Sequence, residues 1–82
     1  MKTTTFSELA FNNIVRKTEK AVCLNCMVSW NANCHSKDIW FPLSVISEWL
    51  QNGHVMVADW FLNKVEESNT FHGYEMRFET RF

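Results

Sequence analysis

Three cysteines and a histidine lie close together in the stretch CLNCMVSWNANCH, residues 23–35. Cys23 and Cys26 have the C-x-x-C spacing, and the adjacent Cys34 and His35 complete a candidate Cys3His zinc set. A zinc knuckle needs a tight turn between its thiolates, usually with a glycine, whereas the first glycine here lies far downstream. On a regular strand, positions i and i+3 point to opposite faces. We therefore favour Cys26 as a small core residue, expect no metal or cofactor, and keep zinc as the less favoured alternative.

Other catalytic chemistry finds little support in the sequence. A thioredoxin-like C-x-x-C has its first cysteine at a helix N-terminus, which lowers the thiol pKa, whereas this pair lies inside a strand pattern. The histidines, His35, His54 and His72, have no Asp or Glu at a spacing typical of an acid–base pair. The chain also contains no G-x-S-x-G, H-E-x-x-H or glycine-rich phosphate loop. We therefore expect a protein that is not an enzyme.

Composition limits the class of protein further. The 82 residues are expected to form a single domain, 1–82, and a hydrophobic fraction of 46 % can supply its core. A formal net charge of −1 offers no general attraction to a phosphate backbone, so nucleic acid is an unlikely partner on this ground. No apolar run approaches the roughly 20 residues of a membrane span, and the N-terminus lacks a signal-peptide core. We expect a cytoplasmic protein with reduced cysteines and no membrane association.

Strand patterns dominate the middle and the end of the chain. Alternation of apolar residues predicts a strand over AVCLNCMVSW, residues 21–30, and KDIWFP, residues 37–42, returns as its hairpin partner. The closing FHGYEMRFETRF predicts a one-sided antiparallel strand whose apolar face carries Tyr74, Met76, Phe78, Thr80 and Phe82. Because one chain does not readily cover all of these side chains, a homodimer edge is a further expectation.

Three short helices are predicted around these strands. Thr5 and Glu8 fit a capping box that favours a helix from about residue 5, although NNIVRKTEK could equally enter a strand. Ser44 can cap a second helix, which Asn-Gly at 52–53 would end. Asp59 can cap a third, WFLNKVEE, with a buried side formed by Trp60, Phe61 and Val65. The predicted fold class is therefore α+β: a small antiparallel sheet, open or partly closed into a barrel, with two or three short helices.

Aromatic residues are the remaining candidates for function. Trp40 and Phe41 are neighbours on a predicted strand, so one of them should face away from the core unless helices cover both sides. An exposed aromatic anchor is typical of a protein-binding surface. The expected partner-binding residues are Trp30, His35, Trp40 and Phe41 of the hairpin, with Arg77 and Arg81 of the last strand as secondary contacts. The alternative is a single-strand nucleic-acid-binding module, in which Arg16 and nearby lysines accompany base-stacking aromatics.

Three segments also carry a family resemblance. IVRKTEKAV, WFPLSVI and VADWFLNKV, between residues 14 and 65, resemble signature segments of small accessory proteins of phages and other mobile elements. The hairpin loop SWNANCHS and Ala58 depart from the usual pattern of that family. The resemblance implies a phage-type protein that binds, and inhibits or modulates, a host protein, such as a CRISPR or other defence complex, as anti-CRISPR inhibitors do. This step rests on origin and size and not on matched functional residues.

Overall fold

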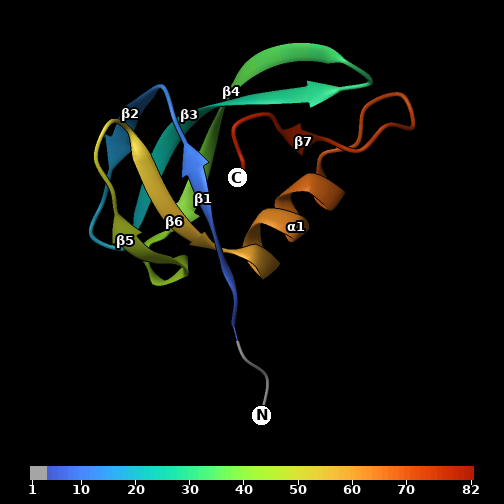
Figure 1. The fold of residues 1–82 in the computed structure, drawn as a ribbon. Helices are drawn as coiled ribbons and strands as arrows, with labels where there is room; N and C mark the ends of the chain where they lie inside the picture. The colour runs from blue at the N-terminus through green and yellow to red at the C-terminus, as the bar shows by residue number, and fades with distance from the viewer. Residues whose placement is uncertain (1–3) are drawn as a thin grey trace.

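The computed structural model describes residues 4–82 as two antiparallel sheets and one α-helix (Figure 1), and residues 1–3 lie outside the described part. The first sheet has the order β1-β6-β5, from β1 (Phe6–Ala10), β6 (His54–Ala58) and β5 (Ile46–Trp49). The second has the order β2-β3-β4, from β2 (Asn13–Lys17), β3 (Ala21–Trp30) and β4 (Asn33–Pro42), and β7 (Arg77–Phe78) also pairs with β3. The two helical elements are the 3-10 turn η1 (Leu43–Val45) and α1 (Asp59–Ser68).

The β3–β4 hairpin is the longest pairing in the fold, and its alternating sequence explains it. Paired residues run from Ala21 opposite Pro42 to Trp30 opposite Asn33, so β4 begins four residues before the predicted strand at 37–42. The expected loop SWNANCHS is reduced to a tight turn at Asn31 and Ala32. The side chains at alternate positions of β3 enter the core, namely Val22, Leu24, Cys26 and Val28. On β4, Phe41 is fully buried while its neighbour Trp40 is 46 % exposed. The outward residue of this pair is therefore Trp40.

The predicted α+β fold class is wrong, because the chain is mostly β and two of the three expected helices are strands. The segment after Ser44 makes a 3-10 turn and then β5, which pairs with β6. Asn52 and Gly53 both have positive φ, 62° and 74°, and they form the turn of this hairpin instead of ending a helix. Asn-Gly serves both purposes, since each needs the left-handed region. A Cβ at Gly53 would also lie 3.0 Å from the Phe11 carbonyl oxygen, so the turn requires glycine.

The N-terminal helix is likewise replaced by β1. Leu9 is fully buried in the pairing with β6, where it lies opposite Val55. Glu8, which was expected to close a capping box, instead contacts the His54 imidazole across the two strands. The capping-box spacing fits a strand as well, and the tertiary pairing decides between them.

The third expected helix exists as α1, but its buried side differs from the prediction. Ala58 occupies the N-cap position without a side-chain bond, and Asp59 is the first helical residue. Leu62 is the residue that enters the core completely, with Phe61 and Val65 partly buried. Trp60 is 55 % exposed, so its predicted burial is wrong.

The C-terminal segment joins the two sheets. Phe78 of β7 pairs with Val28 of β3, and three residues later the chain has crossed to β1. There the Ala10 amide donates to the Thr80 carbonyl at 3.0 Å, and the Phe82 amide donates to the Glu8 carbonyl at 2.8 Å. Figure 1 shows the C-terminus lying between β1 and β7. The predicted one-sided strand over residues 71–82 is therefore wrong in extent, because the strand that forms is the short β7, Arg77–Phe78. Met76 and Phe78 are buried as expected, but Tyr74 is 48 % exposed and Phe82 71 % exposed.

Candidate functional site

An open aromatic hollow lies where the far end of the β3–β4 hairpin meets the turn that precedes β7. Its volume is about 470 Å³, within the range of small binding sites. We call it the hairpin-end hollow, and its lining residues are Trp30, Asn31, Asn33, His35, Phe71, His72 and Tyr74. In Figure 1 the hairpin extends beyond the body of the molecule, and the segment before β7 runs alongside its end.

Two tight turns position these side chains. The first links β3 to β4, and its central residues Asn31 and Ala32 have φ of 46° and 69°. The second has His72 and Gly73 at its centre, with φ of 51° and 83°. Positive φ at both central residues is the geometry of two-residue hairpin turns that follow the natural twist of the strands. Because such turns are short and closed by backbone bonds, both rims of the hollow are well defined.

The second turn is a small hairpin of its own. The Phe71 amide donates to the Tyr74 carbonyl at 2.8 Å, and the Tyr74 amide donates back to the Phe71 carbonyl at 3.0 Å. This reciprocal pair of bonds presents two aromatic side chains side by side. Phe71 is 58 % exposed and Tyr74 is 48 % exposed, so neither belongs to the core.

Trp30 forms the fixed wall of the hollow. Its indole Nε1–H donates to the Asn69 carbonyl at 2.6 Å, and the Asn69 side-chain amide donates to the Val65 carbonyl at 2.7 Å, which ties the ring to the end of α1. The Trp30 ring centroid lies 6.0 Å from that of Phe71 and 5.9 Å from that of His35, with the rings inclined by 56° and 52°. These separations and tilts are typical of favourable aromatic pairs.

A second, more polar hollow adjoins the first. It measures about 350 Å³, and Asn31 and Tyr74 line both hollows. Glu75 and Arg77 line only the second, which we call the flanking hollow. The lining of the hairpin-end hollow contains no Asp, Glu, Lys or Arg. Of the two hollows, the flanking one, beyond Tyr74, is the one that contains such residues.

The expected partner-binding residues are divided among five places. Trp30 and His35 line the hairpin-end hollow, and Arg77 lines the flanking hollow. Trp40 lies on the opposite face of the hairpin, because it pairs with Cys23, which alternates with Val22 and Leu24 along β3. Phe41 is inside the core.

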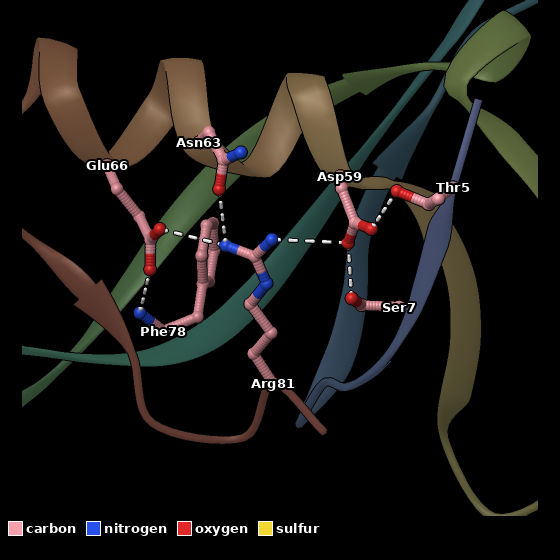
Figure 2. A network of polar contacts seen from close by, with 7 residues as sticks. All are labelled: Thr5, Ser7, Asp59, Asn63, Glu66, Phe78 and Arg81. Atoms are coloured by element: carbon pink, nitrogen blue, oxygen red, sulfur yellow. Dashed lines mark hydrogen bonds and ion pairs between the residues drawn. The ribbon is translucent and has the colours of Figure 1, made fainter. Parts of the chain in front are cut away.

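Arg81, the last expected contact residue, is held within the chain (Figure 2). Its guanidinium donates to Asn63 and Glu66 of α1 at 2.9 Å each, and to Asp59 at 3.2 Å. The opposed charges are partly shielded from solvent, with side-chain exposures of 21 % for Arg81 and 18 % for Glu66. This network fastens the C-terminal segment to the helix.

Asp59 links the same network to the first sheet. The Ser7 and Thr5 hydroxyls donate to its two carboxylate oxygens, as Figure 2 shows. Those hydroxyl bonds, followed by the Arg81 bond and charge, hold the pKa of Asp59 below its ordinary value against partial desolvation. Glu66 also accepts the Phe78 backbone amide at 3.0 Å. These bonds connect β1, α1 and the C-terminal segment, so a structural role explains this polar network.

The four candidate zinc ligands do not converge. Cys23 pairs with Trp40, whereas Cys34 pairs with Ser29, six residues further along β3 and therefore roughly 20 Å away. Burial raises the pKa of the Cys26 thiol to about 12, so it stays protonated. Among residues 4–82, no group of three or more His, Cys, Asp or Glu is placed to hold a metal ion.

One contact between an acidic and a basic side chain could not be predicted from the sequence. His54 Nδ1 lies 2.5 Å from Glu8 Oε2, because the β1–β6 register brings together residues 46 positions apart. The Phe82 ring stacks on the imidazole, with centroids 5.8 Å apart and planes inclined by 5°. The pair thus fixes the C-terminal residue against the first sheet.

Phe71 and Tyr74 were also missed as site residues. The predicted last strand contains both, with Tyr74 on its apolar face. The signal that could have found them is the dipeptide His72-Gly73 between two aromatics, because glycine in such a pair favours a two-residue turn.

No protein-family model, curated protein or solved structure matches the chain. Within the part of the chain that the structure describes, no helix is long and apolar enough to cross a bilayer.

Proposed function

We propose that this chain is a non-enzymatic protein-binding domain, and that the hairpin-end hollow receives an apolar segment of its partner. The observation that carries the proposal is the set of aromatic rings around one hollow without Asp, Glu, Lys or Arg, with Trp30 fixed by its bond to the end of α1. Aromatic side chains supply large contact areas at little cost in side-chain entropy. Because the turns are already closed, the surface needs little ordering when it binds.

A protein partner accounts for this surface better than a nucleic acid does. Base stacking uses exposed aromatics, but affinity for a strand also requires a basic groove along its backbone. The hairpin-end hollow has no lysine or arginine in its lining, and the flanking hollow places Glu75 beside Arg77. On the other face of the hairpin, Trp40 lies near Arg16, but Asp38 shares that face. Neither face is basic.

The identity of the partner is proposed from the resemblance alone. If the chain is a phage-type accessory protein, its partner is a host or defence-system protein that it inhibits or modulates. A cytoplasmic location agrees with three cysteines that are all free, of which Cys34 is exposed. An exposed thiol persists unpaired in a reducing compartment.

The test measures the affinity of a partner for matched variants. Proteins of a lysate from the encoding organism or its host are captured on the wild-type domain, and the captured protein is then purified. Its Kd is measured for the wild type, for Phe71→Ala, for Tyr74→Ala and for the control Trp60→Ala, which removes an exposed aromatic on α1.

Loss of a central aromatic anchor costs about 2 kcal/mol, so each hollow variant should bind about 30-fold more weakly. Trp60→Ala should leave Kd unchanged. Equal affinity for all four proteins would contradict the proposal.

A further inference from the structure

We propose that the segment bound in the hairpin-end hollow is uncharged and proline-rich, in the polyproline II conformation. This inference rests on the proposed function and adds to it the chemistry of the ligand. Polyproline II helices are bound in grooves lined by aromatic rings, against which the pyrrolidine rings pack.

The ring geometry suits such a ligand. Trp30 and Phe71 both line the hollow, and their rings, with centroids 6.0 Å apart and planes inclined by 56°, are tilted and not stacked face to face. Tyr74 stands beside Phe71, since their backbones are paired across the turn. The Trp30 indole N–H is already bonded to Asn69, which leaves its ring surface for contact.

Polar groups at the rim match what a proline-rich backbone offers. A polyproline II segment has a solvated backbone without internal hydrogen bonds, and its prolines present carbonyl acceptors without N–H donors. Asn31 and Asn33 are exposed and carry amide N–H groups, and Tyr74 carries a hydroxyl. No Asp, Glu, Lys or Arg lines the hollow, so a charged ligand group entering it would lose hydration without one of these side chains as a partner.

The position of the hollow favours proline over an added β-strand. A ligand that extends a sheet needs the unpaired backbone of an edge strand. Trp30 and His35 reach the hollow from the inner face of the hairpin, where the register pairs them with Asn33 and Val28. Phe71 and Tyr74 satisfy each other's backbone groups. A ligand resting on such faces gains no ladder bonds, and proline has no N–H to leave unpaired.

The flanking hollow determines at which end of the ligand a charged residue is tolerated. A segment that passes Tyr74 meets Glu75 and Arg77, so a charged residue is tolerated at that end of the ligand alone. At the other end, the Trp30 and His35 side offers no Asp, Glu, Lys or Arg to a charged residue of the ligand.

A displayed library of random decapeptides tests this inference. The library is panned on the wild-type domain, and the enriched pool is counter-selected on the double variant Phe71→Ala, Tyr74→Ala. Trp60→Ala serves as the control that should retain the pool. Selected peptides are then synthesised, and their Kd is measured by fluorescence polarisation before and after each proline is replaced by alanine.

We expect the selected peptides to contain two or more prolines and an uncharged centre. They should bind the double variant at least tenfold more weakly than the wild type, and replacing one proline by alanine should weaken binding to the wild type at least fivefold. Proline-free apolar peptides that depend on the hollow would overturn this inference and uphold the proposed function. Enriched peptides that bind the double variant equally well, or no enrichment at all, would overturn both.

Discussion

Replacing Ala32 by glycine should stabilise the protein. Ala32 has a φ of 69° in the turn that forms one rim of the hairpin-end hollow. A non-glycine residue in the left-handed region costs about 1–2 kcal/mol. Glycine removes that cost but adds about 0.4–1 kcal/mol of chain entropy to the unfolded state. Ala32→Gly should therefore raise the free energy of unfolding by about 0.5–1 kcal/mol, and it creates the Asn-Gly dipeptide preferred in such turns.

The assay is thermal and urea unfolding of the wild type, Ala32→Gly and the matched control Ala21→Gly. For a domain of this size the stabilisation corresponds to a rise in Tm of about 2–8 °C. Ala21 begins β3, where φ is not positive, so glycine there should lower stability by about 0.5–1 kcal/mol. If Ala32→Gly lowers the Tm as Ala21→Gly does, the chain does not adopt this turn and the described rim of the hollow is wrong.

Three further outcomes are expected. Arg81→Ala removes bonds to three side chains and should cost about 2–3 kcal/mol in urea unfolding, whereas the exposed Arg77→Ala should cost less than about 0.5 kcal/mol; equal effects would contradict the network. The pKa of Asp59 is lower in the folded state, so its contribution to the free energy of unfolding is present above its ordinary pKa of 3.8 and is lost as the pH falls through the folded value. Asp59→Asn should therefore flatten the acid side of a curve of stability against pH. An unchanged curve would refute the assignment. Cys34 should react with a thiol reagent in the native protein while buried Cys26 reacts only on unfolding, as mass spectrometry of the labelled peptides would show; rapid labelling of Cys26 would contradict its burial.

The hairpin could be predicted from the sequence, but two helices could not be distinguished from strands. Alternation over residues 21–30 has a period that only a strand satisfies. After Ser44 the apolar residues are few and closely spaced, so they fit either element. Asn52-Gly53 does not decide between helix and strand, since Asn-Gly is common both after helices and in hairpin turns. Pairing with β6 makes this segment a strand, and no local sequence pattern reveals that pairing.

The candidate site was half predictable for a related reason. Trp30 and His35 belong to the hairpin whose strands the pattern identifies. Phe71 and Tyr74 reach the same hollow from a turn some 40 residues later, which the Trp30–Asn69 bond and the β3–β7 pairing hold beside the hairpin. Arg81 looked like a surface residue, because the acidic partners on α1 become neighbours only in the folded chain.

Residues 77–82 join the two sheets, and this also determines the order in which parts of the fold form. The Thr80 hydroxyl donates to the Ala10 carbonyl across 70 positions of the chain, and closing a loop of that length costs about 4 kcal/mol of chain entropy. We therefore expect this contact to form after the local hairpins and to open before them, which native-state hydrogen exchange at Ala10 and Phe82 would detect as lower protection than in β3. Because β7 holds the Phe71–Tyr74 turn beside the hairpin, the hollow is complete only when the last segment is in place. A partner that binds there would thus distinguish the finished molecule from its folding intermediates.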